Sequence, residues 1–208
     1  VAYQIEGEEP LYAIEGSVPI AGAAVQWLRD NLNIIKSSDE IESLAMGEKD
    51  NGDVYFVPAF SGLFSPHWDE TARGSLFGLT RFSNKSHIAR SVLESVAFQS
   101  YELLQSMEKD LGNEFQNLKV DGGMVSNNLL MQFQSDILNK TIISQEINEI
   151  TALGAGVASY IFAKNLNIEN VGDFISTFKT WNPNMSNESR ENLLTSWFKA
   201  IEKSKHWL

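Results

Sequence analysis

The sequence predicts an α/β domain in which a mixed β-sheet is covered by α-helices. Three observations predict this class. Short strand-like runs near the beginning of the chain are separated by turns, as in hairpins. From residue 85 onward, strand-like and helix-like segments alternate along the chain. The 208 residues are 43% hydrophobic and 21% charged, which is close to the globular average, and we expect a single domain.

The first part of the chain is expected to contain a hairpin, two helices and two strands. Ser17 is placed to cap a helix that starts at Val18 and Pro19, because proline is tolerated in a first helical turn. Pro58 ends a strand, since it has no N–H group to donate to a neighbour. The predicted elements are a hairpin of residues 3–5 and 11–14, helices over 18–33 and 37–46, and strands over 54–57 and 75–80.

The second part of the chain begins with the strongest helix signal. Apolar residues recur at helical spacing over 85–111, and Gly112 follows as a helix-ending residue. The further predicted elements are a strand over 118–120, a helix over 129–138, a strand over 141–144 and helices over 151–164 and 188–205. In this order, short strands alternate with helices along the chain, as is typical of an α/β domain.

The most informative stretch is Asp121–Asn128, which reads DGGMVSNN and joins a predicted strand to a predicted helix. Paired glycines allow backbone angles closed to other residues and let a ligand approach the main chain. Unpaired N–H groups at a helix start also favour anions such as phosphate. The stretch therefore indicates a nucleotide site. The alternative is that Gly122 and Gly123 serve only the tight turn that any α/β domain needs.

A second candidate segment carries small residues on consecutive helical positions, from Ala21 to Ala24. Gly22 and Gln26 are four residues apart and therefore share one helix face. A patch without side chains beside an amide can accept a flat heterocycle. Close packing of this helix against a neighbour explains the small residues equally well, and the residues alone do not decide between the two.

The composition disfavours several classes of partner and chemistry. The formal net charge of -11 argues against nucleic acid, because phosphate binding needs clustered Lys and Arg. No run of about 20 apolar residues is present, so we expect no membrane span. The chain has no cysteine, which excludes disulfides and thiolate chemistry. No His, Asp and Glu spacing matches a zinc or calcium pattern, and we expect no metal site.

Two further clusters are interpreted as structural. His67, Asp69 and Arg73 lie in one long loop, and we predict a loop salt bridge there, with a metal or acid–base site as the alternative. Gly154–Gly156 resembles the start of a dinucleotide fingerprint, but Ser159 stands where the third glycine belongs. We therefore interpret these glycines as helix–sheet packing, and a dehydrogenase is disfavoured.

The spacing of three short segments resembles the second signature of the FGGY carbohydrate kinases. These segments are Gly74–Leu79, then His87 with Ile88, then Ser91–Glu94. The resemblance runs from about Tyr12 to Trp197. Within the family it is strongest to members that phosphorylate glycerol, in segments that include residues 57–63, 72–74, 120–123 and 131–136.

The resemblance implies two actin-like, RNase H-like domains with ATP in the cleft between them. Residues 1–208 then form the C-terminal, nucleotide-binding domain, and the N-terminal domain, with the catalytic aspartate and the polyol site, is absent from this chain. No catalytic residue and no metal ligand is expected here. By residue-wise match, the ATP-binding residues are Gly22, Gln26, Gly123 and Asn127. The resemblance also implies a structural role for Asp69, in a turn that is tied to Arg73.

The implied reaction is phosphoryl transfer from MgATP to glycerol, giving glycerol 3-phosphate and ADP. The implied setting is a cytoplasmic enzyme that forms a homodimer or homotetramer. Two alternatives stay open. One is another sugar kinase of the same family, acting on a pentulose or a related polyol. The other is a non-catalytic binding module on an actin-like fold.

Overall fold

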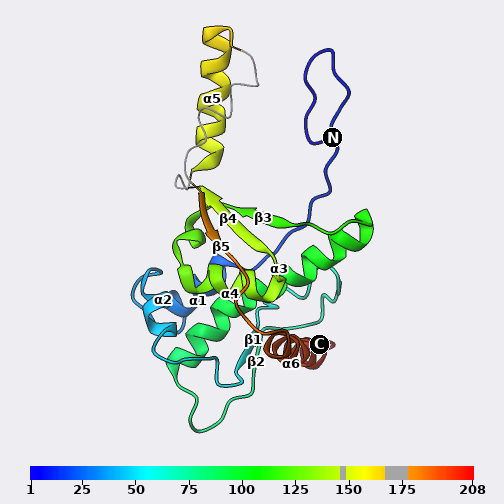
Figure 1. Cartoon of the computed structure of the whole chain (residues 1–208). Coiled ribbons are helices and arrows are strands. Elements are labelled where there is room, and N and C mark those ends of the chain that lie inside the picture. Colours follow the sequence, from blue (N-terminus) through cyan, green and yellow to red (C-terminus); the bar gives the residue numbers. More distant parts are fainter. Residues whose placement is uncertain (146–148, 167–177) are drawn as a thin grey trace.

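The computed structural model describes residues 1–145, 149–166 and 178–208. Its elements follow one another as a mixture of helices and short strands (Figure 1). The helices are α1 (Gly22–Asp30), α2 (Glu40–Ala45), α3 (Lys85–Leu111), the 3₁₀ turn η1 (Gly123–Ser126), α4 (Asn128–Leu138), α5 (Ile150–Lys164) and α6 (Asn187–Ser204). The strands are β1 (Tyr55–Val57), β2 (Ser75–Phe77), β3 (Asn117–Val120), β4 (Thr141–Gln145) and β5 (Phe178–Trp181).

The strands form two small sheets within the described residues. β3 runs parallel to β4, and β4 runs antiparallel to β5, so the three-stranded sheet is mixed as predicted. β1 and β2 pair antiparallel in a separate ladder. Helix α4 packs against β4 and β5, and α3 lies against α4, so two helical layers cover the mixed sheet. The predicted α/β class is confirmed.

Helix α3 is the central element of the fold, and its predicted bounds are confirmed. Asn84 caps its start by accepting hydrogen bonds from the N–H groups of Ser86 and His87, and His87 Nδ1 accepts from the Asn84 N–H in return. Gly112 ends the helix in a left-handed conformation with φ of 68°. The helix contacts α1, α2, α4 and β1, because its apolar residues point in several directions.

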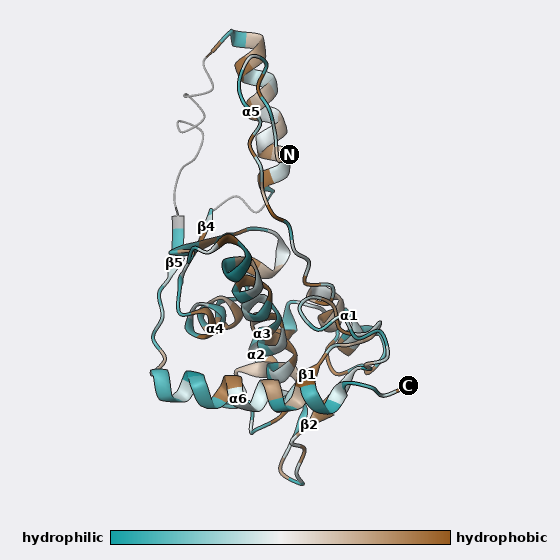
Figure 2. Cartoon of the chain, turned by 90° about the vertical axis from the view of Figure 1, so that its right-hand side faces the viewer, coloured by the Kyte–Doolittle hydropathy of each residue, from teal (hydrophilic) through white to brown (hydrophobic). Residues whose placement is uncertain are grey.

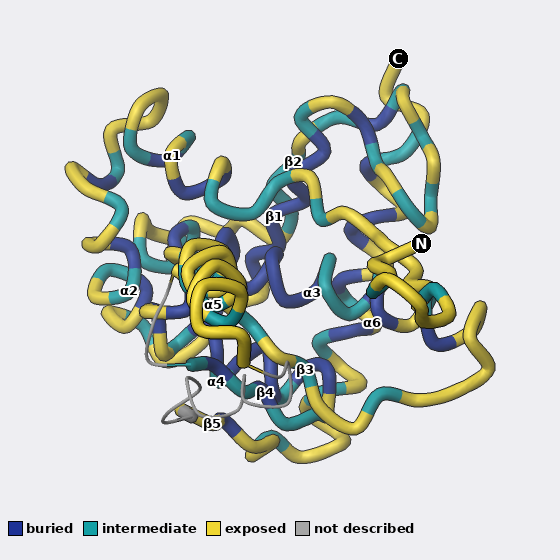
Figure 3. The backbone as a smooth tube through the Cα atoms, turned by 90° about the horizontal axis from the view of Figure 1, so that it is seen from above, coloured by how far each residue is buried: buried dark blue, intermediate teal, exposed yellow. Residues whose placement is uncertain are grey.

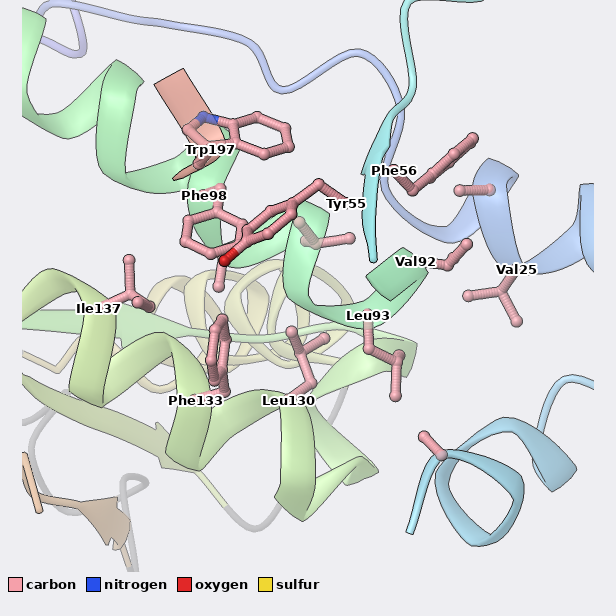
Figure 4. Close-up of a cluster of buried hydrophobic side chains, with 14 of the residues drawn as sticks. Val25, Tyr55, Phe56, Val92, Leu93, Phe98, Leu130, Phe133, Ile137 and Trp197 are labelled. Atoms are coloured by element: carbon pink, nitrogen blue, oxygen red, sulfur yellow. The ribbon is translucent and has the colours of Figure 1, made fainter. Parts of the chain in front are cut away.

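An aromatic stack joins three helices in the core. Phe98 of α3 lies against Trp197 of α6 with ring centroids 4.9 Å apart and nearly parallel planes. The Phe98 ring also meets Phe133 of α4 edge-on, at 5.5 Å (Figure 4). Trp197 is fully buried, so this stack fixes the C-terminal helix to the body of the domain.

Helix α1 begins later than predicted. Its first residue is Gly22, the flanking residue is Ala21, and no side chain caps the first turn, so the predicted capping by Ser17 is wrong. The Ile20 carbonyl accepts a hydrogen bond from Gln99 Nε2 of α3 at 3.0 Å, and the Ala24 N–H donates to the Ala21 carbonyl. The α-helical hydrogen-bond pattern therefore does not extend back to Ile20.

Two other predictions differ from the structure. The predicted N-terminal hairpin is reduced to one antiparallel bridge between Tyr3 and Leu11. Helix α5 forms as predicted, but none of its residues is buried, and Cβ atoms placed on Gly154 and Gly156 would meet nothing within 4 Å. The interpretation of these glycines as helix–sheet packing is therefore wrong. Figure 1 shows α5 standing clear of the body, Figure 3 shows that most of its residues are exposed, and Figure 2 shows apolar residues along it.

Glu94, in the signature segment Ser91–Glu94, is a buried structural residue. Its carboxylate accepts hydrogen bonds from Arg90 Nε and from Asn51 Nδ2, each at 2.9 Å. Burial raises the pKa of Glu94 to about 7, although Arg90 and Asn51 oppose the shift. The signature glutamate thus ties the segment before β1 to α3.

The raised pKa of Glu94 makes stability depend on pH. Because the folded state holds this proton up to about pH 7 and the unfolded state loses it near pH 4.5, wild-type stability falls across that window. Glu94→Gln cannot ionise, so its stability relative to wild type should rise by up to about 3 kcal/mol between pH 4.5 and pH 8. Urea denaturation of both proteins at the two pH values measures the difference. A stability difference that is constant with pH would contradict the prediction.

Candidate nucleotide-binding site

The start of α1 forms one wall of the candidate site. Ala24, Val25 and Leu28 are buried, which leaves Gly22 and Gln26 on the other side of the helix. Gln26 is exposed, and its side chain has no hydrogen-bond partner among the described residues. The expected placement of Gly22 and Gln26 on one accessible face agrees with the structure. No side chain caps α1; of its first N–H groups, that of Ala24 donates to the Ala21 carbonyl at 3.0 Å.

The double-glycine turn forms the second wall. Gly122 follows β3 with φ of 90°, a conformation that favours glycine, and η1 begins at Gly123. A Cβ placed on Gly123 would meet no atom within 4 Å. Within the described part of the chain, no acceptor lies within hydrogen-bond reach of the Gly123 and Met124 N–H groups. The turn therefore presents two backbone donors to an open surface, as an anion site requires.

The two walls lie side by side although they are distant in the sequence. A Cβ placed on Gly22 would lie 3.8 Å from Met124 Sδ, so α1 and η1 meet at these residues. Val125, which is buried, anchors η1 to the same core as α1. The structure thus brings Gly22, Gln26 and the Gly123 turn to one surface.

Asn127 lies just beyond this turn and has a structural role. Its Oδ1 accepts a hydrogen bond from the Leu130 N–H at 2.8 Å and so caps α4. A second side chain, Glu42 of α2, accepts from the Leu129 N–H at 2.9 Å. The start of α4, which the sequence suggested as the phosphate site, therefore has two of its N–H groups already bonded. Asn127 keeps its Nδ2 group as a donor for a ligand, because one lone pair of Oδ1 is already used by the cap.

A hollow adjoins the turn at the ends of the parallel strands. It encloses about 240 Å³ and is lined by Lys119, Val120, Asp121, Ile143, Gln145 and Ile150. Ligands in open α/β sheets favour the carboxyl ends of parallel strands, and this hollow lies at that edge of β3 and β4. It adjoins the candidate site through Asp121, the first residue of the DGGMVSNN stretch.

The loop cluster is separate from this surface and has different contacts from those predicted. His67 pairs with Glu102 of α3, with Nε2 and Oε1 2.6 Å apart. Asp69 accepts from Thr71, Ala72 and the His206 N–H, while Arg73 donates to the Glu70 and Ala72 carbonyls. The predicted pairing of Asp69 with Arg73 is therefore wrong, although the turn itself is present.

Neither general-base chemistry nor metal binding is supported in the loop. The Thr71 hydroxyl, followed by the His206 N–H, lowers the pKa of Asp69 to about 2, so this carboxylate is a weak base. Among the described residues, no group of three His, Cys, Asp or Glu side chains is placed to hold a metal ion.

Gln26→Ala and Asp69→Ala should separate the two regions. We expect Gln26→Ala to raise the Michaelis constant for ATP by a factor that corresponds to one hydrogen bond, on the order of 1 kcal/mol, with little change in melting temperature. Asp69→Ala should lower the melting temperature, because it removes the acceptor that joins the loop to His206, and should change the ATP constant less. Both quantities are measured for both variants of the full-length protein. If Asp69→Ala instead changed the ATP constant and Gln26→Ala lowered the melting temperature, the nucleotide site would have to be assigned to the loop.

Comparisons with known proteins identify the family. The chain matches the model of the FGGY family of carbohydrate kinases, C-terminal domain, over residues 1–161. The glycerol kinases of Brucella anthropi and Methylobacterium radiotolerans are 51% and 49% identical to it, and each match covers 100% of this chain and 42% of the relative. The chain therefore spans about two fifths of the length of these curated relatives.

Solved structures agree with the sequence matches. The crystal structure of Plasmodium falciparum glycerol kinase with ADP matches at a TM-score of 0.87 and 35% identity, covering 96% of this chain and 40% of that one. The ligand-bound xylulose kinase of Lactobacillus acidophilus matches at a TM-score of 0.69 and 22% identity, covering 88% and 37%, and shows the shared fold. The actin-like fold is confirmed. In the described ranges, no helix is long and apolar enough to cross a bilayer. The chain belongs to the FGGY family of carbohydrate kinases.

Proposed function

We propose that residues 1–208 are the C-terminal, ATP-binding domain of a kinase that phosphorylates glycerol. The observation that carries the proposal is the meeting of Gly22 with Met124, which joins the start of α1 and the double-glycine turn into one surface. The similarity to a glycerol kinase whose crystal structure includes ADP supports a nucleotide on this chain. Glycerol kinases that are 51% and 49% identical to this chain over its whole length support glycerol as the acceptor.

In this proposal, the nucleotide lies across the two walls. The Gly123 and Met124 N–H groups donate to phosphate oxygens, and Gln26 and Asn127 Nδ2 contact the nucleoside. Mg²⁺ arrives with the nucleotide and offsets the phosphate charge. The primary hydroxyl of glycerol attacks the γ-phosphorus, the bond to the β-phosphate oxygen breaks, and ADP leaves.

The acceptor hydroxyl and the aspartate that takes its proton are assigned to the N-terminal domain. Asp121 belongs to the turn itself and lines the neighbouring hollow. We place the enzyme in the cytoplasm, where ATP is produced, and infer a homo-oligomer from the family resemblance.

A substrate panel on the full-length protein tests the proposal. Product formation from ATP is followed with glycerol, xylulose and gluconate as acceptors. We expect kcat/KM to be highest for glycerol, and the 208-residue chain alone to give no turnover. A preference for xylulose would favour another sugar kinase of the family. A protein that binds no ATP would favour the non-catalytic module, and turnover by the chain alone would overturn the domain assignment.

A further inference from the structure

The N-terminus of α4 is closed by two side chains from different parts of the chain. Asn127 Oδ1 accepts from Leu130 N at 2.8 Å, which is a local cap. Glu42 Oε1 accepts from Leu129 N at 2.9 Å, and the two residues are 87 positions apart. Adjacent N–H groups of one helical turn are therefore held by a neighbouring residue and by a distant helix.

Helix α2, which carries Glu42, is held in place by buried residues. Ile41 and Ala45 are 3% and 0% exposed and belong to the hydrophobic core. These anchors hold α2 against α3 and α4, with Glu42 half-buried between α2 and the start of α4. A carboxylate at the positive end of a helix dipole is well placed for a charge-assisted hydrogen bond. Lys179 of β5 also lies at this helix start, where its Nζ contacts Asn128 Oδ1.

The position of Asn127 depends on this closure. Asn127 is 9% exposed, and its Oδ1 is committed to α4, so Nδ2 is the only group of its side chain left to donate. Because Oδ1 is bonded to the Leu130 N–H, the orientation of the Asn127 amide, and with it that of Nδ2, follows the position of the first turn of α4. The cap that Asn127 makes cannot hold that turn against the neighbouring α2, whereas the Glu42 hydrogen bond joins the two helices directly.

We propose that Glu42 is a positioning residue for nucleotide binding: it holds the first turn of α4 so that Asn127 Nδ2 donates to the nucleoside part of ATP. The proposal rests on the proposed function. Glu42 touches neither the nucleotide nor the acceptor. Because the lost contact is to the nucleoside, removing Glu42 weakens adenosine, ADP and ATP by the same factor, whatever the number of phosphates.

Titration calorimetry on the full-length protein tests this with four single variants, one double variant and three ligands: adenosine, ADP and ATP. Glu42→Ala is expected to weaken each ligand roughly fivefold, as for the loss of one hydrogen bond. Glu42→Gln keeps an acceptor oxygen and should bind all three like wild type. Asn127→Asp keeps the cap but replaces the donor, and should lose at least as much as Glu42→Ala. Glu40→Ala is the matched control, because Glu40 lies on the same helix and bonds Lys36 N instead.

The deciding result is the double variant Glu42→Ala with Asn127→Asp. If Glu42 acts through Asn127, the double variant binds no more weakly than Asn127→Asp alone. Additive losses of affinity in the double variant would overturn the proposal. A loss of affinity for Glu42→Ala that grows with the number of phosphates would also overturn it. A lower melting temperature for Glu42→Ala with unchanged affinities would assign Glu42 to stability alone. A wild-type protein that binds none of the three ligands would instead refute the proposed function, which separates the two failures.

Discussion

Gly123→Val in the full-length protein is expected to weaken ATP binding more than tenfold, or by over about 1.4 kcal/mol, while the melting temperature stays near wild type. A Cβ at Gly123 would meet no atom of the chain within 4 Å, and the backbone there is outside the left-handed region. The fold therefore tolerates a side chain. The space that valine would fill is the surface in front of the Gly123 and Met124 N–H groups, where we place the phosphates.

Gly122→Val is the matched control for this variant. It adds the same side chain one residue earlier, also with nothing within 4 Å, but at a φ of 90°. Strain at a positive φ should lower the melting temperature, by a free energy on the order of 1 kcal/mol. Differential scanning calorimetry and ATP titration on both variants distinguish strain from blockage. If Gly123→Val loses stability and keeps its ATP affinity, the glycines serve only the turn.

Trp197→Ala should cause the largest loss of stability, about 3–5 kcal/mol. The indole is fully buried and stacked on Phe98, so truncation leaves a cavity between α6 and α3. A loss of this size approaches the whole stability of a typical domain, and we expect α6 to detach at a lower denaturant concentration. Urea denaturation followed by far-ultraviolet circular dichroism measures the change.

Two controls separate ring burial from other effects of this substitution. Trp197→Phe keeps an aromatic ring against Phe98 and removes the indole N–H, which has no acceptor within the described ranges. Its cost should be well below that of alanine, because an unpaired buried donor disappears with it. Phe198→Ala, at a neighbouring residue that is 40% exposed, should cost about 1 kcal/mol or less. Equal losses at 197 and 198 would contradict the stacking argument.

The elements that could be predicted are those defined by local signals. Helix α3 has a long apolar pattern, a capping Asn84 and a terminating Gly112, all of which are visible within the segment itself. The start of α1 was not predictable in this way, because no side chain caps it and the Ile20 carbonyl just before it is bonded to Gln99 of α3. Strand β5 was missed for a similar reason: four residues give little periodicity, and Trp181 is placed by pairing with Ile142 of β4.

In the candidate site, too, features within one segment could be predicted, whereas contacts between distant segments could not. The sequence indicates the Gly22 and Gly123 segments separately, through their small residues, but contains no signal that they meet at Met124. The family resemblance supplied that pairing as an expectation. The cap by Glu42 was missed, because a hydrogen bond across 87 positions leaves no pattern in either segment. Asn127 was predicted as a ligand contact, and its capping role became visible only with the geometry of α4.

The 27-residue helix α3 has a mechanical consequence for the domain. A helix of this length is a rod of about 40 Å, and it contacts α1, α2 and α4 together. One long helix therefore supports both walls of the candidate site, α1 directly and η1 through α4. We expect the spacing between Gly22 and the Gly123 turn to stay the same when a ligand binds, because both are set by the same helix.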